Sequence, residues 1–179
     1  MYKITLDKDD FLRFQLFTAS KSKRIKNKRI RGWILTTFSF LCLGFILSEN
    51  EDKFLSYYFF IIAVISLFFY PLYNRWRYKK HYAKYIEENY KNRMGVECEI
   101  SINGEYLNTK DHTGEGKIKL IEIEEINEIA EDLFIKVKSG ENLIIPRRID
   151  SYDNFIAELK DTTKDSKTEW NDELNWKWK

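Results

Sequence analysis

The sequence predicts an α+β membrane protein in which a transmembrane helical hairpin carries a small antiparallel sheet domain. Two observations predict this class: a pair of uncharged apolar runs early in the chain, and a series of short alternating strands behind them. The runs cover residues 32–48 and 54–73. A bilayer core about 30 Å thick needs roughly 20 helical residues, so the second run spans it unaided and the first must lie nearly upright.

Basic residues flank both runs, whereas the connecting turn at residues 49–53 is short and acidic. Under the positive-inside rule this places both termini in the cytoplasm and the turn outside. A buried hairpin in a soluble protein and a cleaved signal peptide are the weaker interpretations, because the second run follows the first at once. The residues expected at the membrane surface are Lys21, Lys23, Arg24, Lys26, Lys28, Arg29, Arg31, Arg75, Arg77, Lys79 and Lys80.

The formal net charge of +2 conceals two halves of opposite charge. Residues 1–93 carry eighteen Lys and Arg against eight Asp and Glu, whereas residues 94–179 carry twelve against twenty. A basic stem beside the hairpin suits an anionic inner leaflet, where each Lys or Arg gains about 1 kcal/mol. Nucleic acid is the rival partner for a basic cluster. Topology and lipid headgroups already account for the cluster, so we expect membrane lipids and no nucleic acid as partners.

The chain falls into five predicted segments. Residues 1–31 form an N-terminal strand and a basic helix, 32–73 the hairpin, 74–93 a basic juxtamembrane helix, 94–161 the sheet domain and 162–179 a Trp-rich tail. Tyr2, Ile4 and Leu6 alternate with polar residues as in a strand, and Asp7 is suited to cap the helix that follows. That helix is expected to continue through the basic cluster to the first span.

Beyond Gly95 the pattern changes to short strands with one wet face. Asn103-Gly104 predicts a type I′ hairpin turn, because this turn needs positive φ at both central positions. We expect five or six antiparallel strands, capped by a helix that Ser151 starts and that ends near Lys160. The N-terminal strand is expected to complete the sheet. The predicted strands are 96–103, 105–109, 117–123, 126–130, 133–138 and 142–145.

The order of these elements resembles that of the YcxB-like bacterial membrane proteins. After the basic-flanked hairpin and a Tyr/Lys-rich stem come a meander and the run Asn-Leu-Ile-Ile-Pro-Arg-Arg at 142–148, ahead of Ser-Tyr-Asp-Asn-Phe at 151–155. The resemblance covers about residues 1–160 and excludes the tail. It implies a cytoplasmic domain similar to pleckstrin-homology (PH) folds, a small PH-like antiparallel sheet or barrel capped by a C-terminal helix. The family has no established activity, so the resemblance implies architecture rather than chemistry.

No set of side chains predicts catalysis. His81 and His112 lie far apart in sequence, neither cysteine is in a CxxC motif, and no glycine-rich phosphate loop is present. We therefore expect no enzyme activity, no metal and no cofactor. Arg147 and Arg148 follow a strand and are candidates to bind a phosphate or carboxylate, the alternative being two exposed charges at a strand end.

The tail is the second feature of functional interest. Trp170, Trp176 and Trp178 are candidates for contact with the membrane interface or with a partner, since Trp is favoured in both places. Two structures are open for it. Trp170, Leu174 and Trp178 share one face if the tail is helical, whereas the polar residues 161–169 favour disorder.

The leading hypothesis is a membrane-tethered, non-enzymatic binding or scaffold protein. Its cytoplasmic domain would engage an unknown protein partner or a lipid headgroup. The alternative is a self-protection (immunity) protein that shields the cell from a membrane-active peptide or toxin by blocking its insertion. The sequence is compatible with a homo-oligomer in either case.

Overall fold

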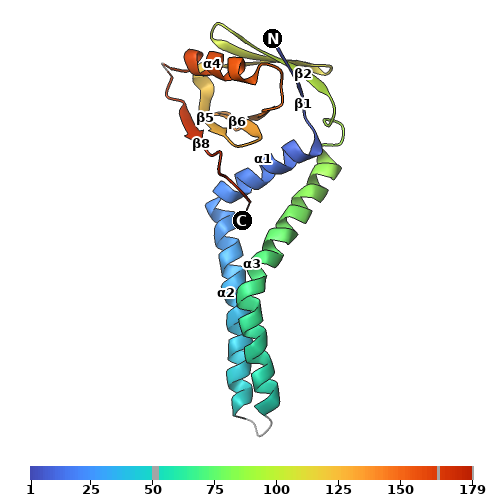
Figure 1. Ribbon diagram of the computed structural model, residues 1–179, viewed down its shortest axis with the longest axis vertical. Helices are drawn as coiled ribbons and strands as arrows, with labels where there is room; N and C mark the ends of the chain where they lie inside the picture. The colour runs from blue at the N-terminus through green and yellow to red at the C-terminus, as the bar shows by residue number, and fades with distance from the viewer. Residues whose placement is uncertain (50–52, 165, 179) are drawn as a thin grey trace. The chain divides into compact units, whose positions relative to one another are not determined.

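The computed structural model describes residues 1–49, 53–164 and 166–178, and in it the chain divides into two units. The sheet unit consists of Met1–Phe14 and Lys84–Lys177, and the hairpin unit consists of Gln15–Ala83 with Trp178. Figure 1 labels the helices and strands of both. The α+β class is confirmed, since the described residues form four α-helices, two of them long and apolar, and two small sheets. Residues 50–52 of the predicted acidic turn lie outside the described residues.

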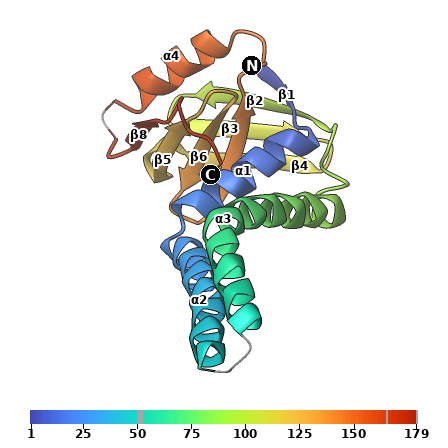
Figure 2. The ribbon, with the colours of Figure 1, turned by 60° about the horizontal axis from the view of Figure 1, so that its bottom comes forward.

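The hairpin unit is built on two antiparallel helices, α2 (Lys23–Ser48) and α3 (Lys53–Asn89), which lie side by side in Figures 1 and 2. The Trp33 indole N–H donates to the Leu67 carbonyl over 3.2 Å. Nearer the turn, the Ser56 hydroxyl donates to the Gly44 carbonyl over 2.8 Å. A Cβ at Gly44 would lie 3.0 Å from the Phe60 ring, so glycine permits this close approach. Small residues at helix contacts are typical of helix pairs in membranes.

Both long helices are apolar enough, and long enough, to cross a membrane. In their most apolar windows only 6% of α2 and 11% of α3 is buried. Leu35, Phe45 and Phe68 are each 67% exposed. The described residues therefore leave most of this apolar surface uncovered.

The predicted continuous helix from Asp7 to the first span is wrong, because α1 (Lys8–Lys21) ends before Ser22. Ser22 has an extended backbone, and its hydroxyl accepts a hydrogen bond from the Ile25 amide at 3.4 Å, so it caps α2. The predicted cap of α1 is confirmed. The Asp7 carboxylate accepts hydrogen bonds from the amides of Asp9 and Asp10 at 2.8 and 3.0 Å.

The sheet unit contains two four-stranded sheets that do not close into a barrel. Sheet A has the antiparallel order β1-β2-β3-β4, with β1 Tyr2–Thr5, β2 Glu97–Asn103, β3 Tyr106–Asp111 and β4 Gly114–Lys119. Sheet B has the order β7-β6-β5-β8, with β5 Ile123–Glu128, β6 Asp132–Val137, β7 Asn142–Pro146 and β8 Glu169–Asp172. The expected pairing of the N-terminal strand is confirmed, since Tyr2 of β1 pairs with Ile100 of β2.

Three details of the sheets differ from the prediction. The run predicted as one strand, 117–123, is split by a 3-10 turn, η1 (Leu120–Glu122), and this turn separates sheet A from sheet B. The tail supplies β8, which pairs in parallel with β5, so sheet B is not purely antiparallel. The β2–β3 turn is centred on Gly104-Glu105, because Asn103 pairs with Tyr106. Gly104 has φ +58° and Glu105 has negative φ, the pattern of a type II′ turn and not of type I′.

The core of the sheet unit lies between the two sheets and helix α4 (Tyr152–Thr162), which Figure 2 shows alongside the sheets. Ser151 precedes α4 as predicted, but it adopts left-handed angles (φ 59°) and its hydroxyl makes no capping hydrogen bond, so the predicted cap is wrong. The fully buried side chains of this core are Leu107, Ile123, Ile126, Leu133, Ile135, Ile145, Phe155 and Leu159.

The opposite face of sheet B is buried as well, beneath the first half of α1. Phe134 of β6 is 2% exposed, and its ring centre lies 5.3 Å from that of Phe14 in an edge-to-face contact. Because both faces of sheet B are buried, a polar side chain on the α1 side needs an internal partner.

Candidate functional site

The predicted anion-binding pair, Arg147 and Arg148, directly follows β7 and uses its guanidinium groups internally. Arg148 Nη1 donates to Asp10 Oδ1 over 2.6 Å. Arg147 Nη2 donates to Glu128 Oε1 over 2.5 Å, and its guanidinium lies 5.2 Å from the centre of the Tyr152 ring. An external phosphate or carboxylate would have to compete with these carboxylates. The ligand role of the pair stays a prediction.

Arg148 belongs to a larger set of charged side chains around two buried carboxylates that the sequence did not single out, which we call the Asp10 cluster: Asp7, Asp10, Arg13, Asp132 and Arg148. Asp10 of α1 and Asp132 of β6 are both fully buried, and the Arg13 guanidinium bonds to both carboxylates. Asp7 lies 3.3 Å from Arg148. Three carboxylates therefore share two guanidinium groups.

Burial governs the protonation of the Asp10 cluster. The pKa of Asp132 is raised to about 6, because desolvation by burial, aided by the charge of Asp10, outweighs the hydrogen bond and charge of Arg13 and the charge of Arg148. Desolvation also acts to raise the pKa of Asp7, but amide hydrogen bonds and the charge of Arg148 outweigh it, so this pKa lies below its usual value. A carboxyl that titrates near neutral pH is one mark of an active site.

The geometry of the Asp10 cluster nevertheless favours a structural role. Within the described part of the chain, every buried side-chain nitrogen or oxygen has a hydrogen-bond partner. The cluster links α1, β6 and the segment after β7, which are far apart in sequence. One signal was present in the sequence: Asp10 and Arg13 are three residues apart on α1 and flank the apolar Phe11 and Leu12.

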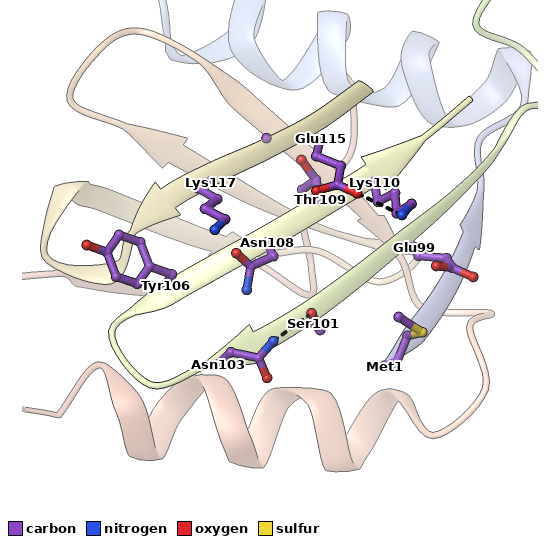
Figure 3. A pocket seen from close by; sticks show the side chains of 11 residues that line it. Met1, Glu99, Ser101, Asn103, Tyr106, Asn108, Thr109, Lys110, Glu115 and Lys117 are labelled. Atoms are coloured by element: carbon purple, nitrogen blue, oxygen red, sulfur yellow. Dashed lines mark hydrogen bonds and ion pairs between the residues drawn. The ribbon is translucent and has the colours of Figure 1, made fainter. Parts of the chain in front are cut away.

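An open groove of about 630 Å³ lies on the face of sheet A that points away from the core, and Figure 3 shows its side chains. This volume is within the range of small-molecule sites. The alternation of β2, β3 and β4 places polar side chains on this face and Ile100, Ile102 and Leu107 on the other. Strand register orders the polar face in three rows: Glu99, Lys110 and Glu115; Ser101, Asn108 and Lys117; Asn103, Tyr106 and Lys119.

The rows differ in charge. In the first, Lys110 Nζ lies 2.7 Å from Glu115 Oε1, and this pair lowers the pKa of Glu115. The second and third rows contain Lys117 and Lys119 but no carboxylate. No ion pair joins either lysine to a described residue. The sequence indicated only a wet strand face here, because the grouping of the rows depends on the register between three strands.

The residues predicted at the membrane surface gather at one end of the hairpin unit, and we call them the basic collar. Those of the first group begin at Lys21, the last residue of α1, and continue into the first turns of α2, whereas the second group lies on α3. Arg29 of α2 lies 5.8 Å from the ring centre of Tyr78 in α3, so the two groups meet at the same end of the hairpin. Apart from the half-buried Arg29, the collar residues are exposed.

The tail is ordered and is not helical over residues 166–178, so the predicted helical face is wrong. Trp170 belongs to β8, packs against the core and donates its indole N–H to Thr163 Oγ1 over 3.3 Å. Trp176 donates its backbone N–H to the Glu173 carbonyl in a turn. Residues 169–172 cannot be helical here, because their backbone is extended and pairs in parallel with β5.

Trp178 belongs to the hairpin unit and is 7% exposed. Its indole N–H donates to the Arg75 carbonyl over 3.2 Å, and its ring centre lies 4.8 Å from the Arg29 guanidinium. Trp178 is thus a packed part of the basic collar. The sequence suggested an interface role for this residue but could not identify these contacts.

The described residues contain no group of three or more His, Cys, Asp and Glu side chains arranged to hold a metal ion. Comparison with known proteins found no matching family model, no matching curated protein and no matching solved structure.

Proposed function

We propose that this chain is a membrane-tethered, non-enzymatic binding protein of the bacterial cytoplasmic membrane, whose sheet unit engages a protein partner or a lipid headgroup. In this proposal the protein is YcxB-like, and the sheet unit is an open relative of PH-like folds. The support for that relation is the order of elements, two sheets followed by the single helix α4, with β1 joining the sheet from before the hairpin.

The observation that carries the tether is the exposed apolar surface of α2 and α3. A core helix of a soluble protein is mostly buried, whereas 6% and 11% of these apolar windows are buried. Leaving apolar surface in water costs about 25 cal/mol per Å², and each large side chain costs roughly 1.5–3 kcal/mol. A bilayer removes this cost without any further protein contact.

The basic collar supports the orientation of the proposed tether. Its eleven Lys and Arg residues lie at the end of the hairpin where the chain enters and leaves. Trp33, Tyr73 and Trp76 lie beside them in sequence, as in an aromatic belt at the membrane interface. Both termini then lie on the cytoplasmic side, and the turn between α2 and α3 lies outside.

Cysteine labelling in intact cells tests the tether and its orientation together. In a C42S/C98S background, E49C marks the end of α2 and K91C marks the segment after α3. We expect a membrane-impermeant maleimide to label E49C in intact cells and K91C only after permeabilisation. Labelling of both only after permeabilisation would refute a spanning hairpin, and labelling of K91C alone would invert the topology.

Photo-crosslinking tests the binding role. A benzoylphenylalanine at Tyr106 samples the sheet unit, and one at Trp76 samples the collar; the two native side chains are 37% and 58% exposed. We expect a reproducible protein or lipid adduct at position 106 and lipid adducts at position 76. Adducts at 76 alone would remove the support for the sheet unit as the binding part.

A further inference from the structure

We propose that the groove on sheet A binds a water-soluble phosphorylated sugar or polyol, with Lys117 and Lys119 on the phosphate and Tyr106 and Asn108 on the hydroxylated body. The inference goes beyond the proposed binding role, because its ligand is neither a protein nor a lipid headgroup. It does not require the membrane tether, so the two can fail separately.

The phosphate end of the groove lies at β4, where Lys117 lines the groove and Lys119, paired with Tyr106, lies just beyond its lining. Lys117 and Lys119 are two residues apart on one strand, so their side chains leave the same face roughly 6.5 Å apart. Neither has an ion pair with a described residue. A phosphate placed between them would accept charge-assisted hydrogen bonds from both ammonium groups and relieve their mutual repulsion. The nearest carboxylate on the strand, Glu115, is held by Lys110 at 2.7 Å.

The hydroxyl-binding part of the groove lies across β3. Register places Asn108 beside Lys117 and Tyr106 beside Lys119, and Figure 3 shows the first pair and Tyr106 along one face. The Asn108 carboxamide and the Tyr106 hydroxyl make no hydrogen bond to a described residue. An amide offers two donors and an acceptor, which suits vicinal hydroxyl groups. The Tyr106 ring, 37% exposed, offers an apolar face to the C–H side of a sugar ring.

The lining of the groove favours a water-soluble ligand over a lipid. Met1 and Tyr106 are the apolar and aromatic residues among those that line it, and the other lining residues are polar, charged or glycine. Acyl chains are held by extended apolar walls. The lysines instead match a compact anion, and the amides match its hydroxyl groups.

Equilibrium dialysis of the full chain in nonionic detergent micelles tests this site, with glucose 6-phosphate and glycerol 3-phosphate as probes. We expect saturable binding of at least one, and at least tenfold weaker binding of glucose and of inorganic phosphate. K117A/K119A should weaken the binding about 100-fold, and Y106A or N108A about tenfold. The control K136A/K138A removes two lysines that are also two residues apart, Lys136 of β6 and Lys138 directly after it, and should leave the affinity within twofold.

Three outcomes would overturn the inference. One is the absence of saturable binding for both sugar phosphates, with the near-ultraviolet circular dichroism showing a folded chain. Another is equal affinity for inorganic phosphate, which would leave only a general anion site. The third is that phosphatidylglycerol vesicles displace the sugar phosphate from the site that K117A/K119A weakens. That result would assign the groove to lipid. The cysteine labelling described above tests the membrane tether independently of these three outcomes.

Discussion

At the residue scale, Asp10 is the buried carboxylate that connects the polar groups of the Asp10 cluster in the sheet unit. Its carboxylate is fully buried and accepts hydrogen bonds from Arg148, from Arg13 and from the Asp7 amide at 2.7 Å. A buried carboxylate with too few donors is strongly destabilising, because its desolvation is no longer offset. The two adjacent arginines of the chain should therefore differ sharply in their contribution to stability.

Replacing Arg148 by Ala should lower the free energy of unfolding by about 1.5–3 kcal/mol, the range for hydrogen bonds to charged groups. The matched control is Arg147→Ala, which removes a more exposed pair with Glu128 and should cost less than about 1 kcal/mol. Urea unfolding of the full chain in nonionic detergent, followed by near-ultraviolet circular dichroism, measures both. Equal costs for the two variants would show that Asp10 does not depend on Arg148.

The raised pKa of Asp132, about 6, makes a pH prediction. An unfolded Asp titrates near 3.9, so between these values the folded state binds more protons. Lowering the pH from 7 to 4 should therefore increase stability through this group by about 2–3 kcal/mol. Asp7, with its lowered pKa, acts in the opposite direction and only at more acidic pH.

Asp132→Asn removes this titration, and the exposed Asp153→Asn is its control. We expect the difference in unfolding free energy between wild type and D132N to change by that amount between pH 7 and pH 4. The D153N variant controls for the loss of one carboxylate at an exposed position. A flat D132N difference would mean that Asp132 titrates alike in both states.

At the element scale, β4 contains two glycines, of which Gly116 has no room for a side chain and Gly114 has room for one. A Cβ at Gly116 would lie 2.7 Å from Thr109 Oγ1 on β3, whereas a Cβ at Gly114 meets nothing within 4 Å. Gly116→Ala should therefore cost about 1 kcal/mol or more through displacement of Thr109. Gly114→Ala should be nearly neutral. The same urea titration reads both, and rescue of G116A by Thr109→Ala would confirm the contact.

The tail strand β8 is an edge strand of sheet B and pairs only with β5, so its contribution can be tested separately. Trp170 packs against the core, with the Lys160 ammonium 5.2 Å from its ring centre. Trp170→Ala should destabilise the sheet unit by about 2–4 kcal/mol, at the low end for large-to-small changes because the ring is only partly buried. Faster hydrogen exchange of the β5 amides in this variant is the measurement. Unchanged exchange would show that β8 adds no stability to sheet B.

At the scale of the whole molecule, the hairpin decides whether the chain resides in a membrane. Val64 lies near the middle of the second apolar run and is 56% exposed. Val64→Arg should oppose insertion by about 3 kcal/mol, whereas Val64→Leu should be neutral. Carbonate-washed membranes from cells expressing each variant measure the integrated fraction. The tether would be contradicted if the folded wild-type chain, like the V64R chain, remained in the supernatant.

The sequence by itself determined most strands of the sheet unit and the two long apolar helices, but not the break between α1 and α2, the turn η1 or the tail strand β8. Hydrophobic period, caps such as Asp7 and the absence of charge over residues 32–48 and 54–73 are local properties, and they act before any long-range contact. The basic collar could also be predicted, because its charges adjoin the apolar runs. The predicted β2–β3 turn was misplaced by one residue, because the pairing of Ile102 with Leu107 sets its position.

Only the tertiary structure decided the pairing of elements and the residues that pairing brings together. The division into two sheets, the parallel β5–β8 ladder and the link from Asp10 through Arg13 to Asp132 all depend on segments that are distant in sequence. The groove likewise depends on the register of three strands, which places Lys117 beside Asn108. No local pattern encodes such contacts, because their energy comes from shared burial and from charges that are neutralised only after the chain has folded.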